Sequence, residues 1–131
     1  VCEPTSVYAK LLHDDAKHWG YTETEALRFA LSNLATIDPN ADRFVVRPHP
    51  SESSDKYTWS LGMSDIEIEL SVGRSLAIDI ANSDVIIGCN TMAMVVGIFS
   101  RKRVLSSIPP GGPPCILPYS EIVMLRDLII K

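Results

Sequence analysis

The sequence predicts an α/β fold: a three-layer, Rossmann-like domain with a mainly parallel sheet of about five strands and helices on both faces. Two observations predict it. Short apolar segments alternate along the chain with segments of helical periodicity. One of these segments, "DVIIG" at residues 84–88, is almost wholly apolar, as expected of a strand buried on both faces. The 131 residues, 46% of them apolar, correspond to a single domain with a real core.

The first residues read as the end of an element. "VCEP" resembles the last residues of a strand followed by its loop, and there is no initial Met. We therefore expect a segment of a longer protein from which upstream sequence has been removed. Residues 7–20 have the pattern of a short helix that Gly20 ends.

The clearest helix spans residues 22–37. Thr22 is placed to cap it, and Glu25, three residues on, completes a capping box. One face of this helix is apolar, as expected for packing on a sheet. The residues on that face are Leu27, Ala30, Leu31 and Leu34.

Strands and helices then alternate. "RFVVR" (43–47) predicts a strand. "DIEIEL" (65–70) alternates apolar and acidic residues, which predicts an edge strand with one solvent-exposed face. The remaining elements are a short helix (74–83), the central strand (84–88), a helix (90–99), a strand (103–107), a loop rich in Pro and Gly (108–118) and a closing helix (119–130). A doubly wound strand order 3-2-1-4-5, with "VCEP" as strand 1, fits this succession.

In open sheets of this kind, ligands bind beyond the carboxyl ends of the strands, where the winding reverses. That point lies between the first and fourth strands. We therefore expect three loops to converge there, at residues 2–6, 47–50 and 88–91.

The turn "GCNTM" (88–92) predicts an anion site. Gly88 permits a tight turn, and Asn90 or Thr91 caps the helix that follows. The free N–H groups of a helix start attract phosphate, to which both polar side chains could add hydrogen bonds. The alternative is an ordinary strand-to-helix turn. The chain has no GxGxxG and no GxxxxGK[ST], which argues against a dinucleotide fingerprint and a P-loop.

The segment "RPHP" (47–50) holds a histidine between two prolines, which restrict its freedom. His49 could donate a hydrogen bond to a phosphate and carry positive charge beside it. Arg47, two residues back and on the same face of the strand, could add a fixed cation. The alternative is a strand end that carries a surface histidine.

Composition narrows the function classes. A net charge of -4 and a pI of about 5.3 argue against duplex nucleic acid as a partner. The three cysteines form no CxxC pair, so we expect no metal site and a reducing, cytoplasmic setting. The group His13, Asp14 and His18 matches no standard metal site and reads as a solvated helix face. No apolar run approaches a membrane span, and peripheral association with a membrane stays open.

Two stretches together are similar to a known family. "RPHPSES..KY" and the later "SLAIDIANSDVIIGCNTMAMVVGIFSRKRVLSSIP" resemble the C-terminal, donor-binding half of GT-B-like glycosyltransferases of capsule and surface polysaccharide biosynthesis. Polyglycerol-phosphate transferases and bacterial sialyltransferases are the closest kinds. The resemblance extends from about Glu3 to the final helix.

The resemblance implies a nucleotide-sugar or CDP-linked donor as substrate, no cofactor, and a location in the cytoplasm or at the inner face of the membrane. His49 would be the catalytic candidate, at the donor phosphate, and Asn90 and Thr91 would also contact phosphate. Glu121 is the match for a glutamate at the donor ribose. Many relatives carry two hydroxyl residues where this chain has Asn90 and Thr91, which leaves the donor type open.

Acceptor-binding residues and the general base usually lie in an N-terminal domain, so the resemblance implies a partner domain in the same protein and an inactive isolated domain. Two alternatives remain open. One is a GT-B-fold sugar-nucleotide epimerase, and the other is a non-catalytic interaction domain, which predicts an exposed apolar patch.

Overall fold

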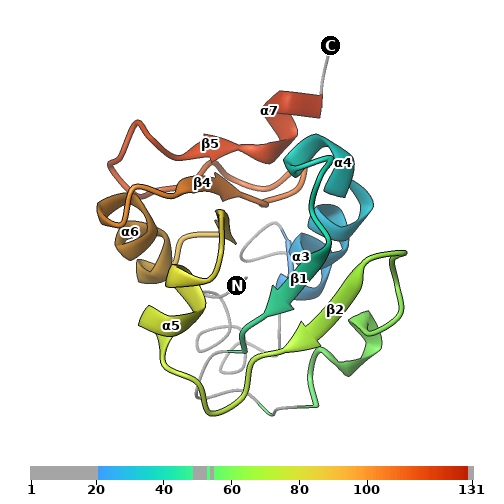
Figure 1. Cartoon of the computed structure of the whole chain (residues 1–131). Helices are drawn as coiled ribbons and strands as arrows, with labels where there is room; N and C mark the ends of the chain where they lie inside the picture. The colour runs from blue at the N-terminus through green and yellow to red at the C-terminus, as the bar shows by residue number, and fades with distance from the viewer. Residues whose placement is uncertain (1–20, 49–52, 54, 130–131) are drawn as a thin grey trace.

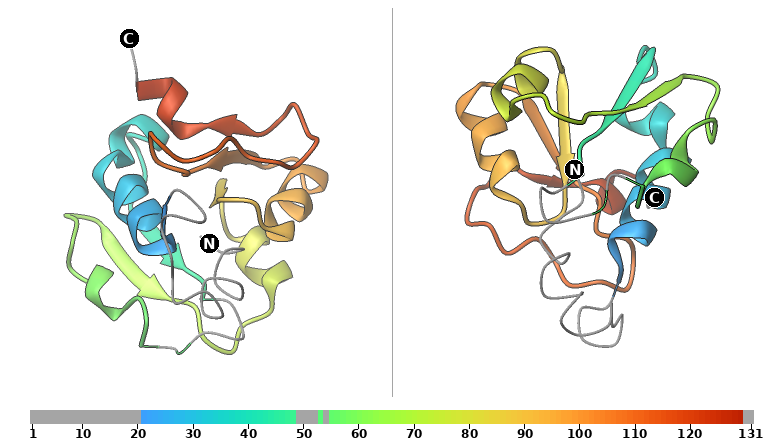
Figure 2. Two further views of the ribbon diagram at one scale, coloured as in Figure 1. Left: turned by 180° about the vertical axis from the view of Figure 1, so that it is seen from behind. Right: turned by 90° about the horizontal axis from the view of Figure 1, so that it is seen from below.

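A computed structural model describes residues 21–48, 53 and 55–129. It has an α/β architecture in which all the paired strands run parallel, as the alternation of elements predicts. The strands lie in two small sheets, of order β1-β2 and β3-β4-β5. Figure 1 shows α5 and α6 on one flank of the molecule and α3 and α4 on the other, and both views of Figure 2 agree.

Helix α3 (Glu23–Ser32) begins as its sequence predicts. The Thr22 hydroxyl accepts a hydrogen bond from the Glu25 N–H at 3.2 Å, which confirms Thr22 as the N-cap. The predicted helix is interrupted at Asn33, whose side-chain amide donates to the Phe29 carbonyl at 2.7 Å. A separate short helix, α4 (Leu34–Ile37), follows.

The first sheet pairs β1 (Arg43–Val46) with β2 (Glu67–Leu70), and a 3₁₀ turn at Thr58–Ser60 lies between them in the chain. Within the described residues β2 has only β1 as a neighbour, which agrees with its prediction as an edge strand. Its alternation is also as expected, since Ile68 is buried and Glu67 is exposed.

The second sheet places β4 (Arg103–Ser106) between β3 (Val85–Gly88) and β5 (Val123–Met124). Helix α5 (Leu76–Ala81), capped by Ser75, precedes β3, and helix α6 (Met92–Phe99) connects β3 to β4. Gly97 lets α6 approach the sheet closely, because a Cβ atom there would lie 2.9 Å from Ile86 Cγ1.

The closing helix predicted over residues 119–130 is wrong in its first part. The chain forms β5 first, and helix α7 (Leu125–Ile129) starts only afterwards. Val123 pairs with Leu105 and Met124 with Ser106, so an exposed edge of β4 recruits this segment. Leu125 is fully buried at the start of α7 and contributes to a core cluster with Leu105.

Candidate functional site

The carboxyl ends of β1 and β3 lie close together, as predicted for two of the three loops. Val46 and Cys89 belong to one buried apolar cluster. Arg47, which directly follows β1, and Ile87, near the end of β3, line one small pocket. The third loop, residues 2–6, and His49 lie outside the described residues, so their convergence with this edge stays a prediction.

The turn from β3 to α6 is built as a capped helix start. The Gly88 carbonyl still accepts from the Ser107 N–H at 2.8 Å, so the strand pairing extends to the turn itself. Of the two predicted caps, Thr91 is the one used, because its hydroxyl accepts from the Ala93 N–H at 3.4 Å. This leaves the N–H groups at the start of α6 directed out of the helix.

Asn90 has a different role, which ties the turn to the loop rich in Pro and Gly. Its side-chain oxygen accepts from the Ile116 N–H at 2.8 Å. Its amide NH₂ remains a donor on the same side chain. The loop therefore lies beside the β3–α6 turn, and the contact joins residues 26 positions apart.

The same loop is fastened at two further places. Arg126 in α7 donates from Nη1 to the carbonyls of Pro109 and Gly112, at 3.0 and 2.7 Å. Nearby, the Ser106 hydroxyl donates to the Cys89 carbonyl at 3.0 Å. These bonds fix the backbone on both sides of the carboxyl edge, so a ligand there would meet an ordered surface.

Cys115 connects the loop with the end of β4. Burial raises the pKa of the Cys115 thiol, although hydrogen bonds from the Leu117 backbone and the Ser106 side chain oppose this effect. The thiol therefore stays protonated and behaves as a half-buried apolar group.

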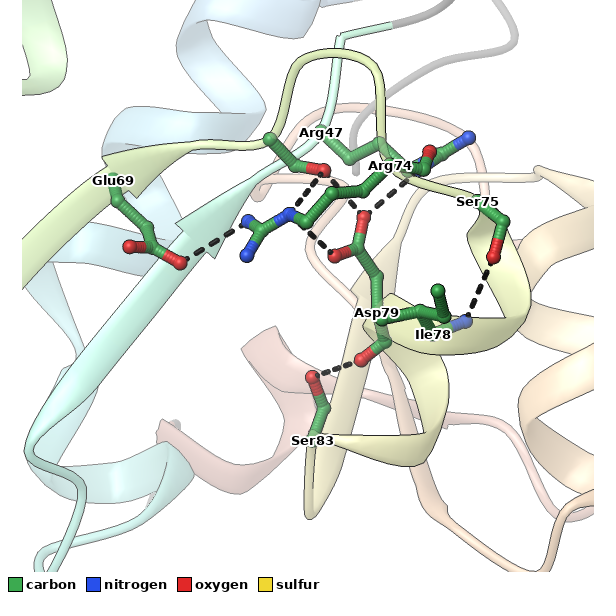
Figure 3. Close-up of polar contacts among 8 residues, drawn as sticks. Arg47, Glu69, Arg74, Ser75, Ile78, Asp79 and Ser83 are labelled. Carbon is green, nitrogen blue, oxygen red and sulfur yellow. Dashed lines mark hydrogen bonds and ion pairs between the residues drawn. The ribbon is translucent and has the colours of Figure 1, made fainter.

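A charged network occupies the end of β1, and Figure 3 shows it. Arg47 donates from Nη1 to Asp79 Oδ2 at 2.9 Å and to the Arg74 carbonyl at 2.7 Å. The Ser71 hydroxyl donates to the same Asp79 oxygen at 2.5 Å. Arg74 approaches the other oxygen of Asp79 at 3.3 Å and pairs with Glu69 at 3.1 Å.

Asp79 is the centre of this network. Burial raises the pKa of its carboxyl, but hydrogen bonds from Ser71 and Arg47 and the charges of Arg74 and Arg47 outweigh burial and hold the pKa below 3.8. Asp79 is therefore ionised at neutral pH. Its charge neutralises that of Arg47, the residue predicted to place a cation beside a phosphate. If Arg47 contacts a phosphate, it does so with a guanidinium that Asp79 already holds in place.

Glu121 lies elsewhere. It is exposed and precedes β5, whose residues pair with the carboxyl half of β4. Its assignment to a donor ribose stays a prediction.

Sequence reasoning missed two residues of this region, Asp79 and Ser106. In the sequence, Asp79 is one residue of a predicted short helix, and its partner Arg47 is 32 positions away. Ser106 is only the end of a predicted strand. The one signal in the sequence was the acidic residue within the otherwise apolar "LAIDIA" of α5.

Across the described part of the chain, no group of three or more His, Cys, Asp or Glu residues is placed to hold a metal ion. The same residues include no helix that is long and apolar enough to cross a membrane. Comparison of the chain with family models, curated proteins and solved structures finds no match.

Proposed function

We propose that this chain is the donor-binding domain of a GT-B-like glycosyltransferase of surface polysaccharide biosynthesis, with a nucleotide-sugar or a CDP-alcohol as donor. The observation that carries the proposal is the β3–α6 turn. It combines a capped helix start with the side chain of Asn90 at the carboxyl edge of parallel strands, which is where α/β folds bind phosphorylated ligands.

In this proposal the diphosphate of the donor lies against the start of α6. The outward N–H groups and the Asn90 amide would donate hydrogen bonds to its oxygens. As the acceptor oxygen bonds to the transferred group, the bond between that group and the nucleotide phosphate breaks. Negative charge accumulates on the departing nucleotide, and fixed donors stabilise that charge. His49 would add a cationic donor, as the resemblance implies.

The finer architecture belongs to the same proposal. It would be a single sheet flanked by helices, in the predicted strand order 3-2-1-4-5. In that order β1 is strand 2 and β3 is strand 4, so strand 1 would lie between them. The two parallel sheets and the shared cluster of Val46 and Cys89 support this arrangement. A partner domain of the same protein would supply acceptor-binding residues and the general base, in the cytoplasm or at the inner face of the membrane.

The test is calorimetric titration of the chain with CMP, CDP, UDP and GDP. We expect one of these nucleotides to bind, and His49→Ala to weaken that binding about tenfold, the loss of roughly 1.4 kcal/mol expected for one charge-assisted hydrogen bond. Thr91→Ala should also weaken it, because the hydroxyl that caps α6 and holds the helix start in place is removed. Thr22→Ala is the matched control, because Thr22 caps α3 in the same way that Thr91 caps α6.

Thr22→Ala should lower stability by about 1 kcal/mol and leave nucleotide affinity unchanged. Binding that Thr91→Ala and His49→Ala leave intact would contradict the proposed site. If the folded chain binds none of the four nucleotides, the proposal that the isolated domain binds the donor is contradicted.

One observation favours a second candidate, a non-catalytic interaction domain. Helix α6 exposes apolar side chains on successive turns: Met92 is 66% exposed and Phe99 is 74% exposed, with Val96 between them. Ile78 of α5 is also exposed. An apolar ridge of this kind marks a contact with another protein. Sedimentation of the chain at rising concentration, beside Phe99→Lys, would show whether the ridge mediates self-association.

A further inference from the structure

The guanidinium of Arg47 is fastened on one side and open on the other. Its Nη1 donates to Asp79 Oδ2 at 2.9 Å and to the Arg74 carbonyl at 2.7 Å, which uses both N–H groups of that nitrogen. Among the described residues, Nε and Nη2 of Arg47 have no hydrogen-bond partner, and 22% of the side chain is exposed. Three N–H groups therefore remain for a ligand.

The open side of Arg47 has the geometry that binds an oxyanion with two hydrogen bonds. The Nε–H group and one N–H group of Nη2 point in the same direction, and a phosphate accepts from such a pair through two of its oxygens. A free arginine loses side-chain entropy when it adopts one orientation. Since the orientation of Arg47 is already fixed, an oxyanion binds there with little further loss of side-chain freedom.

Asp79 is itself held firmly in place. Its Oδ2 also accepts from the Ser71 hydroxyl at 2.5 Å, and its Oδ1 lies 3.3 Å from Arg74 Nε. Its backbone carbonyl accepts from the Ser83 hydroxyl at 2.7 Å. Figure 3 shows the carboxylate of Asp79 at the centre of these contacts. Because both of its oxygens are occupied, Asp79 orients Arg47 and does not itself receive a ligand.

The charges around Arg47 favour an anion on its open side. Arg47 and Arg74 both contact Asp79, so that two guanidinium groups share one carboxylate. The second carboxylate of the network, Glu69, pairs with Arg74 and is more exposed than Asp79. In the described part of the chain, no carboxylate contacts the open side of Arg47, and its potential is therefore positive.

Arg47 lies at the same edge of the molecule as the turn proposed for phosphate, but it belongs to a different strand. It directly follows β1, and it lines one small pocket with Ile87 of β3, three residues before Asn90. Within the residues that the structure describes, β1 and β3 are not hydrogen-bonded neighbours. Their ends are therefore farther apart than the roughly 4.8 Å between paired strands. Two successive phosphate groups suit two such separated sets of donors better than one.

We propose that Arg47 and the start of α6 form a paired-phosphate site, in which Asp79 positions Arg47 and the Nε–Nη2 side of Arg47 binds the second phosphate. The inference rests on the proposed function and narrows its substrate class. The donor is linked through a nucleoside diphosphate, because a CMP-linked donor lacks the group that Arg47 binds. Asp79 is a positioning residue, since it acts only through the guanidinium that it holds.

Calorimetric titration of the chain with matched nucleotides tests the inference, using CMP and CDP, UMP and UDP, and GMP and GDP. We expect the diphosphate to bind at least about tenfold more tightly than the monophosphate of the same base. Asp79→Asn should remove this preference and leave the monophosphate affinity unchanged. Removal of a negative charge alone would strengthen anion binding, so a weaker diphosphate affinity reports that Arg47 has lost its position.

Glu69→Gln is the matched control. It makes the same change of carboxylate to amide in the same network, but Glu69 pairs with Arg74. Both nucleotide affinities should stay unchanged in this variant.

A second variant covers the case in which Asp79→Asn does not fold. Arg47→Lys keeps the positive charge but has no paired N–H groups, and it should remove the same preference for the diphosphate. It also identifies the Nε–H signal of Arg47 in a ¹H–¹⁵N NMR spectrum of the arginine side chains. In the wild type that signal should shift with the diphosphate and stay in place with the monophosphate.

Three results would overturn the inference. They are equal affinity for the two members of every pair, an equal loss of both affinities in Asp79→Asn, which a merely structural role predicts, and an Arg47 Nε–H signal that no diphosphate moves. If no nucleotide binds, the proposed function fails, and inorganic pyrophosphate decides about the site itself. A shift of the Arg47 signal with pyrophosphate supports the paired-phosphate site without a nucleoside, whereas no shift overturns the site as well.

Discussion

Replacing Asp79 by Asn tests the network that holds Arg47. The substitution preserves the shape of the side chain and removes the charge that Arg47, Arg74 and Ser71 share. The Asp79 side chain is 12% exposed and that of Arg47 is 22% exposed, so the pair lies between an exposed and a fully buried salt bridge. Exposed pairs contribute about 0.2–1 kcal/mol, whereas removal of one partner from a buried pair costs about 3–5 kcal/mol.

We therefore expect Asp79→Asn to lower the free energy of unfolding by about 2 kcal/mol. Glu69→Gln is the matched control. It makes the same change of carboxylate to amide, but Glu69 is more exposed and pairs only with Arg74 among the described residues. Its cost should stay below about 1 kcal/mol.

Urea unfolding, followed by far-UV circular dichroism, measures both variants. With a slope of about 1–3 kcal/mol/M, the midpoint of Asp79→Asn should fall by about 1 M and that of Glu69→Gln by clearly less. Equal losses in the two variants would refute the view that Asp79, rather than the exposed pair, organises this end of β1.

The remaining predictions concern acid stability and two buried contacts. Because the pKa of Asp79 is lower in the folded chain than its ordinary 3.8, its contribution is complete well above pH 3.8 and is lost as the pH falls through the folded value. The difference between wild type and Asp79→Asn should shrink in that acid window in pH-dependent urea titrations, and a constant difference would contradict this. Gly97→Ala should gain about 1 kcal/mol of helix propensity but lose about 1–3 kcal/mol by crowding Ile86. A rise in its thermal midpoint would show that the helix–sheet contact has room. Lys56→Met should cost about 3 kcal/mol in urea unfolding, because Glu23 is 1% exposed and pairs with Lys56 at 2.5 Å. A cost below about 1 kcal/mol would mean that Glu23 does not depend on Lys56.

Local signals predicted the helices and strands best. The Thr22 cap, the apolar "VIIG" and the alternating "EIEL" depend on near neighbours, and the structure places an N-cap or a strand at each of them. The closing helix was partly mispredicted because Val123 and Met124 suit a helix and a strand equally. The free edge of β4 decides between the two, and that edge is not visible in the local sequence.

The candidate site was predictable only in its outline. The sequence indicates a capped turn after β3, but whether Asn90 or Thr91 is the cap depends on the loop around Ile116, to which Asn90 is bonded. The pairing of Arg47 with Asp79 depends on how β1 meets α5, which no local pattern encodes. Glu121 was assigned only from the resemblance, and its position before β5 follows from the same unpredicted strand.

The most direct test of the proposed function is a ¹⁵N NMR titration of the chain with the nucleotide that calorimetry identifies. The account predicts that the backbone amides of residues 89–93 shift together and saturate with the same dissociation constant. The amides of Val45 and Val85, which line a pocket between β1 and β3, should stay unchanged. Saturable shifts confined to that pocket, or spread along the exposed face of α6, would contradict a phosphate site at the β3–α6 turn.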